Sequence, residues 1–131
     1  MNMSKKEYNR YVARLAQKSP LGKDLLRSFL VGGLICVIGQ LILNGFTALD
    51  LSEQDAAAAT SVSLVFLSAV LTGLSVYDDI AKFAGAGTLV PITGFANAVV
   101  SPAIEFKAEG WVTGMGAKIF TIAGPVIAFG T

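Results

Sequence analysis

Apolar residues fall into long runs along the chain, separated by short polar stretches. The first run, at about residues 25–49, carries one charge near its start, and the second, at about 56–77, carries none. Roughly 20 apolar residues cross a hydrocarbon core of about 30 Å as a helix. We therefore expect two regular transmembrane helices, joined by an acidic connection at 50–55. Ser52 predicts the cap of the second helix, and Tyr77 an aromatic anchor at its interfacial end.

A third apolar region, at 83–104, is long enough to span but is interrupted by glycine and proline. The interrupting residues are Gly85, Gly87, Pro91, Gly94 and Pro102. Proline removes an intrahelical hydrogen bond, and each unpaired backbone group in lipid costs several kcal/mol. We expect a discontinuous or re-entrant helix, covered by protein or by a water-filled cavity. A kinked span packed in a bundle is the alternative.

The last apolar run, at 111–131, predicts a final transmembrane segment that Trp111 anchors at the interface. Small residues let helices approach closely, and polar side chains in lipid need polar partners in a neighbouring helix or in water. The helix-packing positions that we expect on these grounds are Gly32, Gly33, Gln40, Asn44, Gly110 and Gly114.

Residues 1–23 are predicted to form a basic amphipathic segment that lies on the membrane surface. Ser4 and Glu7 make a capping box, and the apolar residues that follow share one helix face. The basic residues expected on the lipid surface are Lys5, Lys6, Arg10, Arg14 and Lys18. A solvated or partner-bound helix is the alternative. Basic residues favour the cytoplasmic side, so the N-terminus is expected inside and the 50–55 loop outside.

Composition supports a single transmembrane domain, at 24–131, in an all-α integral membrane protein. The chain has 131 residues, of which 53% are hydrophobic and 15% charged, whereas soluble domains average about 25% charged. Seven of its ten basic residues precede residue 28. Because this basic segment leads directly into an apolar run, we expect anionic lipid rather than nucleic acid as its partner.

The residue types argue against catalysis and against a bound metal or cofactor. The chain has no histidine and a single cysteine, Cys36, which excludes intramolecular disulfides, Cys/His zinc sites and histidine-dependent triads. A membrane enzyme would have to use the paired carboxylates Asp78 and Asp79, which are better placed to cap the following segment. We therefore predict a protein that is not an enzyme.

Polar residues recur every four positions through the broken region and just beyond it, at Thr93, Asn97, Ser101, Glu105 and Glu109. On a helix this spacing makes one polar stripe, which suits either an aqueous path or hydrogen bonds to another helix. Broken helix ends expose backbone donors, and Lys118 is a cation within apolar sequence that either faces the path or snorkels. The expected path-lining residues are Gly85, Gly87, Thr88, Pro91, Thr93, Gly94, Asn97, Ser101, Glu105 and Lys118.

Several blocks are similar to a known family. Two blocks, FLVGGLICVIGQ at 29–40 and the long apolar block at 71–130, which begins LTGLSVYDDIAKFAGAG and ends KIFTIAGPVIAFG, resemble the stage V sporulation protein AC (SpoVAC) family of endospore formers. The most specific part is 83–101. The basic N-terminal segment favours the AC type over the related AE type.

The resemblance implies a subunit of the SpoVA complex in the spore inner membrane, with its N-terminus on the core side. That complex moves dipicolinic acid, with calcium, into the forespore and out again in germination, and the family member is described as a mechanosensitive channel. One chain has too few spans to enclose a pore, so a hetero-oligomer with other SpoVA subunits is expected. A non-conducting scaffold that anchors the other subunits is the alternative.

Overall fold

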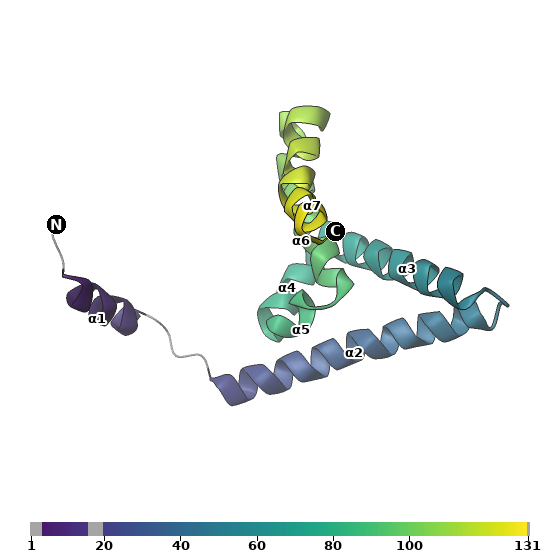
Figure 1. Cartoon of the computed structure of the whole chain (residues 1–131), viewed down its shortest axis with the longest axis horizontal. Coiled ribbons are helices and arrows are strands. Elements are labelled where there is room, and N and C mark those ends of the chain that lie inside the picture. The colour runs from purple at the N-terminus through teal and green to yellow at the C-terminus, as the bar shows by residue number, and fades with distance from the viewer. Residues whose placement is uncertain (1–3, 16–19, 131) are drawn as a thin grey trace.

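The computed structural model describes residues 4–15 and 20–130, and every regular element in these ranges is helical (Figure 1). The elements are α1 (Lys5–Leu15), α2 (Leu21–Thr47), α3 (Glu53–Gly73), α4 (Val76–Ala84), α5 (Ala86–Leu89), α6 (Ile92–Glu105), the 3-10 turn η1 (Phe106–Glu109), the π-helical turn η2 (Trp111–Gly116) and α7 (Ala117–Gly130). The predicted all-α fold is confirmed.

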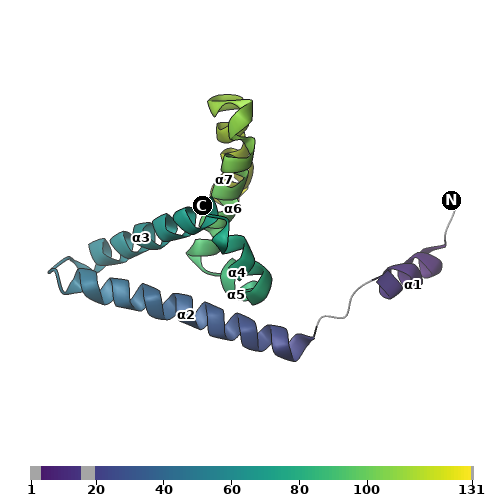
Figure 2. The same cartoon turned by 180° about the vertical axis from the view of Figure 1, so that it is seen from behind.

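Helices α2 and α3 form a V-shaped hairpin that closes at the acidic turn (Figures 1 and 2). The short helices α4 and α5 lie between its arms at the open end, and α6 packs against both α3 and α7. Three helical stretches are long and apolar enough to cross a membrane: Leu21–Thr47, Glu53–Gly73 and Trp111–Gly130. The two regular spans and the final span therefore appear as predicted in kind, with shifted ends.

The second spanning helix is capped as the sequence predicted, because Ser52 Oγ accepts a hydrogen bond from the backbone N–H of Asp55 at 3.2 Å. It ends at Gly73, earlier than expected. Ser75 then adopts a left-handed conformation with φ 59°, which turns the chain into α4. The prediction that Tyr77 anchors the interface is wrong: its side chain is 4% exposed, inside the helix packing.

The third apolar region is discontinuous, as predicted. Gly85 has φ +53° and ψ −121°, a conformation that side chains disfavour, and it separates α4 from the single turn of α5. Pro91 is extended and separates α5 from α6. Helix α6 has 14 residues and is about 21 Å long, so it is shorter than a hydrocarbon core of about 30 Å. Gly94 and Pro102, which were also expected to interrupt the region, instead lie within α6.

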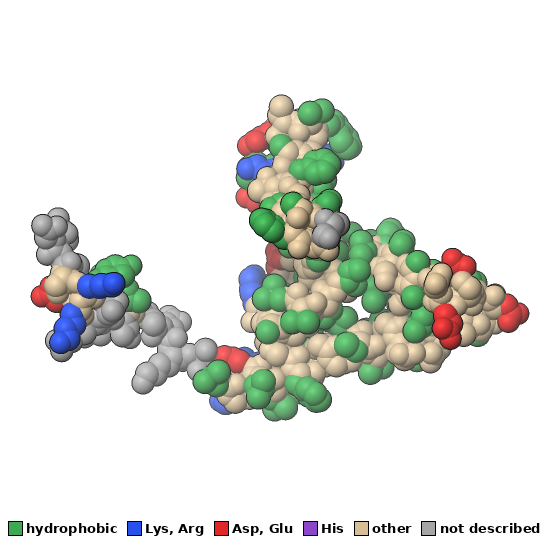
Figure 3. Space-filling model, in the orientation of Figure 1, with side chains coloured by type: hydrophobic (Ala, Val, Ile, Leu, Met, Phe, Trp, Pro, Cys, Tyr) green, Lys and Arg blue, Asp and Glu red, His purple; other side chains and the backbone are tan. Residues whose placement is uncertain are grey.

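Few side chains are buried in the described part of the chain, and most of these are small. The buried apolar residues are Ala56, Tyr77, Ala84, Ala96 and Ala103. In α2 no residue is buried, and large apolar side chains cover much of the surface of the hairpin (Figure 3). Apolar surface of this extent requires lipid or further protein around it. The chain is thus an integral membrane protein in which few side chains are buried by contacts within the chain.

Helix α1 lies apart from the other helices (Figure 1) and begins with the predicted capping box. The backbone N–H of Ser4 donates to Glu7 Oε2 at 3.0 Å, and the backbone N–H of Glu7 donates to Ser4 Oγ at 3.4 Å. The Ser4 hydrogen bonds lower the pKa of the Glu7 carboxyl.

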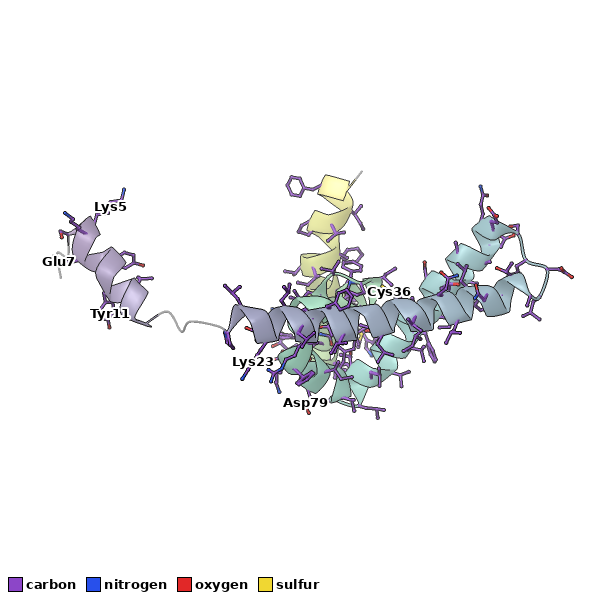
Figure 4. All side chains as sticks on the ribbon, turned by 90° about the horizontal axis from the view of Figure 1, so that it is seen from below. Lys5, Glu7, Tyr11, Lys23, Cys36 and Asp79 are labelled. Carbon is purple, nitrogen blue, oxygen red and sulfur yellow. The ribbon has the colours of Figure 1, made fainter. Side chains whose placement is uncertain are left out.

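The residues predicted on the lipid surface belong to this helix or to the segment that follows it. Lys5 and Lys6 are exposed (Lys5 is labelled in Figure 4), and Arg10 and Arg14 lie within α1. Lys18 falls outside the described residues. The interfacial role of α1 stays a prediction.

Candidate functional site

The end of α4 and the turn of α5 pack tightly on the first half of α2. Ser28 Oγ donates a hydrogen bond to the carbonyl oxygen of Ala84 at 2.8 Å. Gly87 approaches the α2 backbone so closely that an added Cβ would lie 2.8 Å from Ser28 Cα. On the facing side, a Cβ at Gly32 would lie 3.2 Å from the carbonyl oxygen of Gly87. Glycine at both positions is what permits this approach.

Buried polar groups connect α3, α4, α5 and α6 across both breaks. The Tyr77 hydroxyl lies 3.1 Å from the carbonyl oxygen of Thr88 and 3.0 Å from Thr93 Oγ1. Ser68 Oγ, on α3, donates to the carbonyl oxygen of Thr93 at 2.6 Å. The side chains of Thr88 and Thr93 are buried. These contacts satisfy backbone groups near the breaks that lipid could not satisfy.

One turn further along α6, Asn97 meets α3. Thr72 Oγ1 lies 2.8 Å from Asn97 Oδ1 and 2.7 Å from the carbonyl oxygen of Ser68. The first two residues of the predicted polar stripe, Thr93 and Asn97, therefore face α3, with Thr93 buried and Asn97 half-buried. Hydrogen bonding to another helix, an alternative that the sequence left open, accounts for Thr93 and for one contact of Asn97, which remains partly exposed.

The other half of the stripe is more accessible. Ser101 is half-buried and Glu105 is exposed at the end of α6. Lys118 is half-buried with Nζ 4.0 Å from the centroid of the Phe106 ring, which is a cation–π contact. Among the candidates at the breaks, Gly85 is exposed and Pro91 half-buried. Gly87 and Gly94 are buried, which leaves their positions closed to a ligand in this arrangement.

The predicted helix-packing positions divide into two groups. Gly114 is buried, and an added Cβ would lie 2.9 Å from Glu109 Cβ. Gly110 instead provides a positive φ of +106° between η1 and η2. On α2, Gly33 has open space around it, and the exposed pair Gln40 and Asn44 hydrogen bond to each other at 2.9 Å. In the described part of the chain, this amide pair makes its side-chain hydrogen bond within α2 and not to another helix.

Two residues of the site were missed by sequence reasoning, Ser28 and Tyr77. The available signal was weak, because it was only that a hydroxyl in an apolar stretch must find a partner. The carboxylates Asp78 and Asp79 are exposed in the first turn of α4, and Asp79 pairs with Lys82 at 3.0 Å. Among the described residues, no group of three or more His, Cys, Asp or Glu side chains could hold a metal ion.

The chain is similar in sequence to a known protein family. A family model described as SpoVAC/SpoVAEB sporulation membrane protein matches residues 24–131, which include the broken segment and all of the candidate spanning helices except the first three residues of α2. The chain belongs to this family. This match confirms the resemblance of the sequence blocks to the SpoVAC family.

A curated relative supports the same family over almost the whole length of the chain. Stage V sporulation protein AC of Bacillus subtilis (strain 168) is 44% identical over 131 residues, which cover 99% of this chain and 87% of that protein. Since the family match begins at residue 24, α1 lies outside it, whereas the match to this relative includes α1. No solved structure matches the chain.

The hydrogen bonds of the Tyr77 hydroxyl lead to a first prediction. Tyr77→Phe should lower the free energy of unfolding in detergent by about 1–2 kcal/mol, because it leaves buried oxygens at Thr88 and Thr93 with one partner fewer. Tyr8→Phe, at a tyrosine that is 58% exposed, is the control and should change nothing. Equal unfolding midpoints for the two variants in a denaturant titration would contradict the assignment.

Proposed function

We propose that this chain is a membrane subunit of a channel for dipicolinic acid, with calcium, in the spore inner membrane. In this role it serves uptake into the forespore during sporulation and release during germination, with its N-terminus on the core side. Membership of the SpoVAC/SpoVAEB family supports the sporulation context. The proposed cargo is inferred from the sequence resemblance, and the proposed route is inferred from the arrangement of the helices.

The observation that carries the proposal is the discontinuous α4–α5–α6 segment. Non-helical backbone at membrane depth persists where protein or a water-filled cavity covers it, and transport proteins commonly use such breaks to contact a substrate. Here α2 and α3 cover one side, through Ser28 and Ser68. A path for an anion would follow the other side.

We assign the candidate residues to two roles on this basis. The accessible ones, Gly85, Pro91, Asn97, Ser101, Glu105 and Lys118, are proposed to line the path. The buried ones, Gly87, Thr88, Thr93 and Gly94, are proposed to fix the broken segment against α2, α3 and α4. A subunit of this size encloses no pore alone, so the complete path requires further SpoVA subunits or copies around the exposed apolar surface.

The alternative is a scaffold that anchors a conducting subunit. The observation in its favour is α1, whose exposed Lys5 and Lys6 lie apart from the membrane helices and could hold a partner instead of lipid. The two functions differ in one respect, since only the channel subunit contributes side chains to the path.

Reconstitution separates the two. Liposomes loaded with dipicolinate and carrying this chain with its partner subunits should release the anion after an osmotic downshift, as expected of a mechanosensitive channel. Liposomes that carry the partners alone should release little. If the partners alone conduct as well as the full set, while co-purification shows that the complex assembles, the chain is a scaffold.

A further inference from the structure

A cleft of about 480 Å³ opens between the first turns of α2 and the junction of α4 and α5. Its walls are largely apolar, with charged groups from both helices among them. The lining residues are Leu21, Asp24, Leu25, Arg27, Ser28, Lys82, Phe83, Ala84, Gly85 and Ala86. None of the proposed path residues except Gly85 belongs to it, so the cleft is a separate feature of the fold.

Arg27 is the principal cation of this cleft. Its guanidinium carbon lies 4.8 Å from the centroid of the Phe83 ring, a cation–π contact that joins α2 to α4. Among the described residues, Arg27 makes no ion pair with a carboxylate. The planar guanidinium therefore keeps N–H donors for an external anion, and its geometry suits phosphate and carboxylate groups.

The lining residues of the cleft carry two positive charges, on Arg27 and Lys82, and one negative charge, on Asp24. Lys82 lines it from α4, and Asp24 lines it from α2. Lys82 also pairs with Asp79 at 3.0 Å, but both of these side chains are more than three-quarters exposed, so water screens the pair and Lys82 can serve a second anion. Lys23 also lies in the first turns of α2.

The geometry points to a headgroup site for an anionic phospholipid, with the lipid phosphate between Arg27 and Lys82. Leu21 and Leu25 at the same cleft are 81% and 73% exposed, which gives an acyl chain an apolar surface beside the charged groups. The site lies at the start of a spanning helix, where basic pockets between helices bind acidic headgroups. A free carboxylate anion would use the cations but gain nothing from the exposed leucines.

Lipid titration of the purified full-length chain in detergent, read by native mass spectrometry, tests this site. Phosphatidylglycerol should bind in preference to phosphatidylcholine. Arg27→Gln and Lys82→Gln should each weaken phosphatidylglycerol binding about fivefold, and the double variant about 25-fold. The matched control is Lys107→Gln, at an exposed lysine of η1 outside the cleft, which should bind as the unmodified chain does. Arg27→Lys keeps the charge and should recover part of the loss.

Three results would overturn the proposal. One is a double variant that retains the phosphatidylglycerol affinity of the unmodified chain while its circular dichroism shows the same helix content. Another is a competition in which free dipicolinate or inorganic phosphate displaces the lipid at equal concentration, because the apolar contacts would then contribute nothing. If Lys107→Gln weakens binding as much as Arg27→Gln does, attraction is general to the surface and the site is equally refuted.

Discussion

Replacing Gly87 by alanine is expected to destabilise the membrane domain by about 2–3 kcal/mol and to separate α5 from α2. The added Cβ would lie 2.8 Å from Ser28 Cα and still closer to the Ser28 carbonyl oxygen, both of which are backbone atoms that cannot rotate away. The gain in helix propensity from glycine to alanine is at most about 1 kcal/mol, so the clash dominates. Unfolding in detergent by a denaturant titration measures the loss.

The control for this variant is Gly33→Ala on the facing helix α2. An added Cβ at Gly33 meets nothing within 4 Å, so stability should stay the same or rise slightly. Gly32→Ala, whose Cβ would lie 3.2 Å from the Gly87 carbonyl oxygen, should fall between the two. Equal stability of Gly87→Ala and Gly33→Ala would show that α5 does not pack on α2 in this way.

Asn97→Leu is expected to reduce dipicolinate flux about tenfold in reconstituted complexes, while the complex still assembles. Loss of one polar contact of about 1.4 kcal/mol in the path corresponds to that factor in rate. The substitution also removes the hydrogen bond between Asn97 and Thr72, which complicates a single measurement. A second variant therefore distinguishes the role of Asn97 in the path from its role in packing against α3.

Thr72→Val supplies that comparison. It removes the same interhelical hydrogen bond from the α3 side but leaves the Asn97 amide in place. If Asn97 lines the path, Thr72→Val should conduct nearly as well as the unmodified protein. Equal loss of flux in the two variants would assign Asn97 a packing role only.

The sequence was sufficient to predict the regular spans and the existence of the break. Uncharged runs and the Ser52 cap predict α2 and α3 because both signals act within one helix. The interruption at 83–104 followed from Gly85 and Pro91, whose backbone preferences are local. Local chemistry thus accounts for where helices form and where they stop.

Contacts between helices could not be predicted in the same way. The partner of Tyr77 depends on the turn at Ser75, where a residue other than glycine adopts a positive φ that no pattern indicates. The stripe at Thr93 and Asn97 was recognised as polar, but periodicity alone does not tell whether such a stripe meets α3 or water. The cation–π contact that joins Arg27 to Phe83 likewise depends on packing between residues 56 positions apart.

Cysteine accessibility in intact membranes tests the proposed route most directly. In a Cys36→Ala background, which removes the single native thiol, cysteines are introduced at Asn97, Ser101 and Glu105 of the assembled complex. Phe95→Cys is the control, because two residues along a helix place it about 200° away, on another face of α6. The proposed function predicts that a charged, membrane-impermeant thiol reagent modifies the three path positions, more slowly when dipicolinate is present, and leaves position 95 unmodified. Modification at 95 as fast as at 97 and 101, or no modification at any of the three path positions, would contradict the route.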